Sequence, residues 1–273
     1  TDVPISLDME ALKREQPDEE ELRKIFEELE FRTLLDRILK TEKKTAAPAA
    51  SSQSDLFGFF TDENAGEQKK SNLTRLEDLN FDYQLIDSED KIDELLQNIV
   101  TKDFFSLDTE TTGTDPITAE LVGMSFSFTE NQAFYVPVPA NREEALKIVN
   151  KFKSILENEK TLKIGQNIKY DMLVLGNYGV EVRGPMFDTM IAHYVLQPEL
   201  HHGMDYLAEV YLKYETIKIE ELIGPKGKNQ KNMRDLKPEE VYEYAAEDAD
   251  ITLQLRNVLE KKLDEVNARR LFE

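Results

Sequence analysis

The sequence contains no cysteine and only three histidines, His193, His201 and His202, among its 273 residues. Disulfides and thiolate metal sites are therefore excluded, and a zinc site built on histidines has few ligands to draw on. The chain has no apolar run of 18 residues, the length that a membrane-spanning helix requires, and it shows no signal-peptide pattern. These absences fit a reducing, cytoplasmic setting with no membrane span.

Basic residues are also scarce. Lysine and arginine total 34 against 55 acidic residues, which gives a net charge of −21. A protein that reads nucleic-acid sequence usually carries a broad basic face, and this chain has too few cations for one. Any contact with a nucleic acid must then be local, metal-assisted or helped by a partner domain. The hydrophobic content of 40% is nevertheless ample for a globular core.

The first 44 residues contain one amphipathic helical pattern but too few apolar residues for a separate core. Pro17 suits the first turn of a helix, and the acidic run Asp18–Glu21 suits the positive end of the helix dipole. Apolar residues then recur at helical spacing at Leu22, Ile25, Phe26 and Leu29. We expect this helix to pack on a partner outside the sequence.

Residues 45–78 have the composition of a mobile linker. The segment Thr45–Ser54 is small and polar, and the segment Glu67–Asn72 is charged and without periodicity. The apolar island Leu56–Phe60 interrupts them, and we interpret it as a locally packed loop, with a docking motif as the alternative. Strand and helix patterns begin near Leu79, where we expect a second domain to start.

From residue 79 onward, strand patterns come first and helical patterns then interleave with them. Ser88 is placed to cap a helix, and alternating apolar residues over Val122–Phe128 predict a strand followed by a turn. The expected strands are 83–87, 104–107, 122–128, 133–138 and 162–164, and the expected helices begin near residues 89, 142, 168 and 238. This order predicts an α/β domain, with a mixed sheet flanked by helices.

The strand pattern Phe104–Leu107 leads directly into two acids, Asp108 and Glu110. Residues two apart on a strand point to the same face, so both carboxylates project together from the end of a core strand. Two close, buried carboxylates repel each other, and a divalent cation that prefers oxygen ligands, such as Mg²⁺ or Mn²⁺, removes that repulsion. The alternative is a strand that opens into a polar turn, with its acids in water.

Asp171 follows a short strand that ends at Gly165. This order places Asp171 at the C-terminal edge of the sheet, where ligands bind in open α/β sheets, although an ordinary strand-to-helix turn also explains Gly165.

Further along, Gly224–Arg234 is the only dense basic loop of the acidic domain. It suits either contact with a phosphate backbone or simple solvation.

The helical pattern over residues 238–263 separates two acids that are close in sequence. At about 100° per residue, Asp248 falls within the apolar stripe and Tyr244 lies one turn earlier on the same side. Asp250 falls on the opposite face, which we expect to be solvated. A carboxylate within an apolar stripe requires a bound metal or a salt bridge to a buried Lys or Arg.

Three segments together resemble the motifs of the DEDD exonuclease superfamily, Tyr branch. They are Asp108-Thr109-Glu110, Asn167-Ile168-Lys169-Tyr170-Asp171 and Tyr244-Ala245-Ala246-Glu247-Asp248. The sequence from about Phe81 to the C-terminus is similar to the proofreading domain of bacterial DNA polymerase I, and residues 1–44 look like the end of the 5′ nuclease domain that precedes it there. The resemblance implies a ribonuclease H-like fold for residues 79–273. The first residue, Thr1 rather than Met, also suggests a fragment or a processed product.

By this resemblance, the site is a 3′→5′ exonuclease centre that uses two divalent cations, Mg²⁺ or Mn²⁺, with Zn²⁺ an option at one position. Asp108, Glu110 and Asp248 would hold one cation. Asp171 would serve the second, which Asp108 shares, through a shell of water. Tyr244 would orient the attacking water, because a phenol pKa near 10 favours positioning over proton abstraction. The substrate-binding residues would be Thr109, Thr114, Gln166, Asn167, Tyr170, Lys226 and Lys228.

The sequence departs from these relatives where the substrate would be gripped. Only Thr114 stands where they carry an apolar wedge, and Ile219 stands at their aromatic stacking position. We expect a monomer whose partners are a single-stranded DNA 3′ end and the polymerase and 5′ nuclease domains of the same parent chain. Two alternatives stay open: an RNA 3′-trimming enzyme like ribonuclease D, and a retired nuclease fold that serves as a spacer or binding module.

Overall fold

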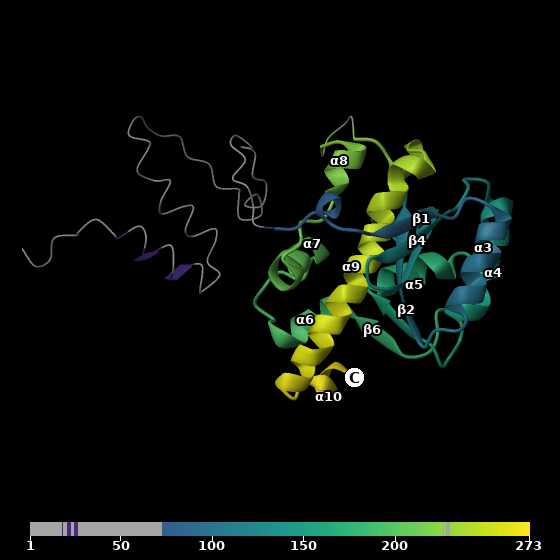
Figure 1. The fold of residues 1–273 in the computed structure, drawn as a ribbon. Coiled ribbons are helices and arrows are strands. Elements are labelled where there is room, and N and C mark those ends of the chain that lie inside the picture. Colours follow the sequence, from purple (N-terminus) through teal and green to yellow (C-terminus); the bar gives the residue numbers. More distant parts are fainter. Residues whose placement is uncertain (1–17, 19–20, 23–24, 27–72, 226, 228–229) are drawn as a thin grey trace, which may run out of the picture. The chain divides into compact units, whose positions relative to one another are not determined.

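The structure is a computed structural model that describes residues 18, 21–22, 25–26, 73–225, 227 and 230–273 (Figure 1). Two units are separated along the chain, Thr1–Glu67 and Gln68–Glu273. In the first unit, the Asp18 carboxylate accepts a hydrogen bond of 3.0 Å from the backbone N–H of Glu21, so Asp18 caps the start of a helix; Pro17, predicted for the first turn, lies outside the described residues. The apolar island Leu56–Phe60 lies outside the described residues.

The second unit is built on a six-stranded sheet with the strand order β1-β4-β3-β2-β5-β6. Its strands are β1 (Asp82–Leu85), β2 (Phe104–Thr111), β3 (Leu121–Thr129), β4 (Gln132–Pro137), β5 (Leu162–Gly165) and β6 (Met186–Asp188). Strand β3 is antiparallel to both of its neighbours, and the other adjacent pairs are parallel. The predicted mixed sheet, with a hairpin between β3 and β4, is confirmed.

The helices in the described part of this unit are α3 (Glu89–Ile99), α4 (Arg142–Leu156), α5 (Lys169–Gly176), α6 (Thr189–Leu196), α7 (Met204–Leu207), α8 (Ile219–Ile223), α9 (Pro238–Glu265) and α10 (Arg269–Phe272). The helices predicted to begin near residues 89, 142, 168 and 238 are present as α3, α4, α5 and α9, and the described part of this unit contains others. Short 3₁₀ turns span Leu76–Asp78 and Met233–Asp235, and a π-helical segment spans Ala208–Leu212. The predicted cap of α3 is confirmed, because the Ser88 hydroxyl accepts a hydrogen bond of 3.4 Å from the backbone N–H of Lys91.

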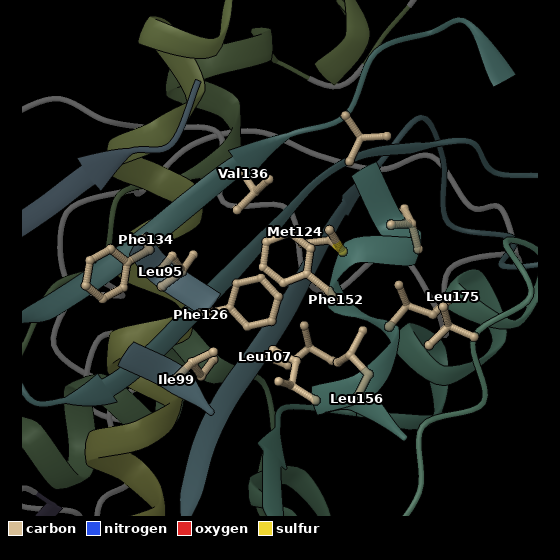
Figure 2. Close-up of a cluster of buried hydrophobic side chains, with 14 of the residues drawn as sticks. Leu95, Ile99, Leu107, Met124, Phe126, Phe134, Val136, Phe152, Leu156 and Leu175 are labelled. Atoms are coloured by element: carbon tan, nitrogen blue, oxygen red, sulfur yellow. The ribbon is translucent and has the colours of Figure 1, made fainter. Parts of the chain in front are cut away.

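One face of the sheet packs against α3 and α4 through large apolar side chains (Figure 2). The rings of Phe126 and Phe152 stack with their centroids 5.1 Å apart, and Leu107 of β2 lies in the same cluster. Successive residues of a strand point to opposite faces. Because Leu107 faces this core, Asp108 and its neighbours two residues away must face the other side of the sheet.

On that other side, α9 crosses the sheet (Figure 1), and small side chains let it approach closely. The Ser106 hydroxyl donates a hydrogen bond of 2.7 Å to the carbonyl of Ala249 on α9. Gly123 of β3 lies against the ring of Tyr135, and any Cβ at this position would overlap that ring. A helix this close to the sheet can bring its own side chains to the end of β2.

The segment before β1 also contacts this unit. Thr74 forms an isolated parallel bridge with Tyr214, and the guanidinium of Arg75 donates two hydrogen bonds of 2.9 Å to the carboxylate of Glu215. The sequence patterns place the start of the domain a few residues later, at Leu79. No helix within the described residues is both long enough and apolar enough to cross a membrane.

Candidate active site

Strand β2 and helix α9 bring three carboxylates together. Oxygen atoms of Asp108, Glu110 and Asp248 all lie within 4.8 Å of one another. Asp108 and Glu110 share the face of β2 that Ser106 presents to α9, as the strand period predicts. Asp248 comes from the part of α9 that packs on the sheet, and it is 6% exposed. The structure thus assembles these acids from positions about 140 residues apart in the sequence.

Asp171 approaches the same end of β2 from the first turn of α5. It is buried, and its Oδ1 accepts a hydrogen bond of 2.6 Å from the hydroxyl of Thr109, the residue between the two acids of β2. Burial and then the charge of Asp108 raise the pKa of Asp171. The link to Thr109 fixes the direction from which Asp171 faces the cluster.

Without a bound cation, the negative charges of four acids, Asp108, Glu110, Asp171 and Asp248, are unfavourable at this site. Burial raises the pKa of Asp108 to about 6. Burial and then the charges of neighbouring acids, Asp108 first among them, raise the pKa values of Glu110, Asp171 and Asp248 well above the usual range. Within the described part of the chain, none of the four forms an ion pair with Lys, Arg or His. The salt bridge considered for Asp248 is therefore absent from this part of the chain.

These residues fit a hard divalent cation. Mg²⁺ binds oxygen ligands at about 2.1 Å, so two ligands on opposite sides of the ion lie about 4.2 Å apart. The observed spread of up to 4.8 Å needs only a small contraction to reach that arrangement. A cation would also compensate the repulsion that raises these pKa values. Carboxylate oxygens suit Mg²⁺ or Mn²⁺ better than they suit soft metals.

Tyr244 lies one turn before Asp248 on α9, on the side that the helical period predicts. Burial and then the negative charges of Asp248, Glu110 and Asp108 raise its pKa further above the ordinary value. The phenol therefore stays protonated at neutral pH and can donate a hydrogen bond. It is suited to holding a ligand in place and poorly suited to accepting a proton.

A family model described as 3′-5′ exonuclease matches residues 83–264, which is most of the chain. The chain belongs to the 3′-5′ exonuclease family. Its relatives include DNA polymerase I of Borreliella burgdorferi, 34% identical over 231 residues, and DNA polymerase I of Pseudomonas aeruginosa, 33% identical over 276 residues. These alignments cover 84% and 97% of the chain but only 25% and 28% of the two relatives. The exonuclease chain thus spans about a quarter of the length of the polymerases that it matches.

Solved structures agree on the fold. Brucella melitensis NrnC bound to pGG is similar with a TM-score of 0.54 and 21% identity, over 71% of the exonuclease chain and 86% of NrnC. Trypanosoma brucei RNase D is similar with a TM-score of 0.54 and 19% identity, over 66% and 65% of the two chains. The predicted ribonuclease H-like α/β fold is confirmed, and so is the predicted resemblance to the exonuclease domain of DNA polymerase I.

The described substrate residues predicted from the sequence make different contacts. The Tyr170 hydroxyl donates a hydrogen bond of 2.5 Å to the carbonyl of Gly113, and it lies 2.6 Å from the Thr111 hydroxyl. This contact ties α5 to the loop after β2. Thr114, in that loop, is exposed. Lys226 and Lys228 lie outside the described residues.

Gln166 and Asn167 occupy the turn between β5 and α5. The Gln166 side chain donates a hydrogen bond of 2.7 Å to the carbonyl of His202 and accepts one from the Thr189 hydroxyl. Asn167 has a positive φ of 62°, and its backbone N–H donates to the carboxylate of Asp188 at 3.1 Å. The Gln166 side chain is thus held by neighbouring elements, and Asn167 by its backbone.

The prediction that Asp250 faces solvent is wrong. Asp250 is 1% exposed, and its carboxylate accepts hydrogen bonds from the Tyr83 hydroxyl at 2.8 Å, the backbone N–H of Asn131 at 2.9 Å and the Gln254 amide at 3.1 Å. A helical wheel assumes one apolar stripe and one solvated face. Here α9 contacts β1, β3 and β4, so residues all around the helix are buried from Ala245 to Leu253. The available signal was Ala249 before Asp250 and Ile251-Thr252-Leu253 after it, which leave little polar sequence for a solvated face.

Sequence reasoning also missed two groups that hold the site in place. Glu247, adjacent to Asp248, is fully buried and accepts hydrogen bonds from the Tyr214 hydroxyl at 2.5 Å and the backbone N–H of Ile217 at 2.8 Å. Asn232 donates a hydrogen bond of 2.6 Å to the carbonyl of Thr112, just past the end of β2. No local pattern marks these residues, because their partners are remote in the sequence.

Proposed function

We propose that this exonuclease domain removes nucleotides from DNA 3′ ends by hydrolysis that uses two divalent cations, as the proofreading part of a bacterial DNA polymerase I in the cytoplasm. The observation that supports this most is the convergence of Asp108, Glu110 and Asp248 within 4.8 Å, with buried Asp171 linked to the same strand end. Four acids gathered without a basic partner in the described structure are costly to the fold. A purely structural role gives no reason to retain them.

Each residue has a distinct part in the proposed mechanism. Asp108, Glu110 and Asp248 would hold one cation, and Asp171 would serve a second, shared with Asp108. Such cations supply Lewis acidity toward the attacking water and the phosphate that is cleaved. Tyr244, held protonated by its surroundings, would donate a hydrogen bond that orients the water for in-line attack. Thr109 would position Asp171 through its 2.6 Å hydrogen bond.

The substrate end would enter as a single strand, because a chain with a net charge of −21 has too few cations for a broad basic face. Backbone contacts and stacking would replace sequence readout there. Thr114 is exposed, and Ile219 offers only an aliphatic surface, so the terminal base would be gripped less firmly than by an aromatic residue. The relatives are named DNA polymerase I, which supports a parent chain that also contains a polymerase domain. A 5′ nuclease domain in that chain and a monomeric state on DNA are further parts of the proposal.

The test is digestion of a 5′-labelled single-stranded DNA with Mg²⁺, with Mn²⁺ and with EDTA. We expect shortening in single-nucleotide steps with either metal and no shortening in EDTA. Asp248→Asn provides the matched control, since it keeps the shape of the side chain and removes one ligand charge. Equal activity in EDTA, or equal activity of Asp248→Asn, would contradict the proposed chemistry.

A matched RNA strand in the same assay separates the main alternatives. Faster digestion of RNA than of DNA would replace proofreading with RNA trimming. Absence of digestion of both strands with either metal would favour a retired nuclease fold.

A further inference from the structure

Ser125 carries a buried hydroxyl with no hydrogen-bond partner within the described structure. The residue lies in the middle of β3, is 0% exposed, and its Oγ makes no hydrogen bond there. Buried polar groups in native proteins almost always form hydrogen bonds with protein, water or an ion. A buried hydroxyl without a partner is therefore unusual and indicates a specific role. The neighbouring serines of this sheet face, Ser106 and Ser127, are both paired.

The register of the sheet places Ser125 beside the carboxylate cluster. Ser125 is directly opposite Asp108 across the antiparallel pair β2–β3. Residues directly opposite in such a pair share a face and have Cβ atoms about 4.5–5.5 Å apart. On its other side Ser125 is paired with Tyr135, whose ring lies against Gly123, one position further along that face of β3. The Ser125 hydroxyl therefore lies between the sheet and α9, next to Asp108.

We propose that Ser125 is a positioning residue for the cation site: its hydroxyl donates a hydrogen bond to the carboxylate of Asp108, directly or through one water, when a divalent cation is held by Asp108, Glu110 and Asp248. This inference rests on the cation site of the proposed function. The bond would hold one oxygen of Asp108 and direct the carboxylate toward Glu110 and Asp248. Groups that orient metal ligands in this way typically change metal affinity by 10- to 100-fold when they are removed.

Ser127 is a matched control on the same strand and the same face. It is also 0% exposed, but its hydroxyl already donates to the carbonyls of Gln132 at 2.7 Å and Thr129 at 3.2 Å. Its partner in the sheet register is Ser106, one face position away from Asp108. Ser127→Ala therefore removes a buried hydroxyl of the same size, one that is paired and lies away from the carboxylates.

The experiment measures Mn²⁺ affinity by electron paramagnetic resonance and melting temperature in EDTA, for the wild-type chain and for Ser125→Ala, Ser127→Ala and Asp248→Asn. We expect Ser125→Ala to weaken Mn²⁺ binding by about 10-fold or more, with a melting temperature in EDTA equal to or above that of the wild type. We expect Ser127→Ala to melt earlier and to bind Mn²⁺ with wild-type affinity.

Two results would overturn the inference in distinguishable ways. Wild-type affinity in Ser125→Ala, with weakened binding in Asp248→Asn, would remove Ser125 from the site and leave the cation site intact. Failure of the wild-type chain to bind Mn²⁺, or unchanged binding in Asp248→Asn, would remove the cation site itself and the role of Ser125 with it.

Discussion

Asp248 and Asp250 allow a sharp test, because they are the same residue type on one helix and have opposite expected roles. Asp250→Ala removes the buried acceptor of two hydrogen bonds, those from the Tyr83 hydroxyl and the backbone N–H of Asn131. Asp248→Asn instead removes one of four mutually repelling carboxylates and keeps the shape of the side chain. We expect the first variant to be unstable and catalytically competent, and the second to be stable and inactive.

The magnitude for Asp250 follows from its contacts. A hydrogen bond to a charged group contributes about 1.5–3 kcal/mol. Part of that contribution is offset, because burial raises the pKa of Asp250 and its charge is itself unfavourable in the fold. A net loss of about 2–3 kcal/mol remains, and for a domain of this size it lowers the melting temperature by roughly 4–12 °C. Removing the Asp248 charge should leave the metal-free melting temperature unchanged or higher.

The assay compares melting in EDTA and single-turnover digestion of 5′-labelled DNA with Mg²⁺, at a temperature well below the lowest melting point. Asp250→Ala should digest DNA at a rate close to that of the wild type under these conditions, and Asp248→Asn should be nearly inactive. An unchanged melting temperature for Asp250→Ala would show that the hydrogen bonds accepted by Asp250 do not stabilise the fold. Full activity of Asp248→Asn would refute the site.

Three further outcomes are expected. Tyr244→Phe should lower turnover by about 10- to 1000-fold and leave Mn²⁺ affinity nearly unchanged, since the phenol is expected to position water and not to bind metal; equal losses in both would make Tyr244 a ligand. Gly123→Ala should destabilise the domain by about 1–3 kcal/mol in thermal melting, because the added Cβ overlaps the Tyr135 ring; wild-type stability would show that the ring moves freely. In EDTA, the contribution of Asp108 to folding stability should fall as pH rises from about 4 to about 6 and then level off, because its pKa is raised from 3.8 to about 6 and its charged form is disfavoured in the fold. Asp108→Asn should flatten that decline, whereas a stability that rises over this range in the wild type and not in the variant would contradict the direction of the shift.

The parts of the site that the sequence predicted share one property: a local period determines where they point. Asp108 and Glu110 follow from the strand period of two, and Tyr244 and Asp248 follow from the helical period over a single turn. Asp171 follows from the strand-to-helix order, which places it at the C-terminal edge of the sheet, and the motif resemblance then implied its role. These inferences need only short stretches of sequence and the direction of the core.

The parts that the sequence did not predict depend on contacts between remote segments. The hydrogen bond from Thr109 to Asp171 joins residues 62 positions apart, and the hydrogen bond from Asn232 to Thr112 joins residues 120 apart. The burial of Asp250 depends on β1 and the β3–β4 turn packing beside α9, which a single-helix wheel does not represent. These two hydrogen bonds and the burial of Asp250 depend on tertiary packing, which no local sequence pattern predicts.

The most direct test of the proposed cation site is anomalous X-ray diffraction from crystals of the exonuclease domain soaked in Mn²⁺. We expect one manganese peak between the carboxylates of Asp108, Glu110 and Asp248, and a second peak, with a 3′ end bound, between Asp108 and Asp171. Crystals that show no manganese among these four carboxylates, while the same protein digests DNA with Mn²⁺, would contradict the assignment of these residues as the catalytic metal site.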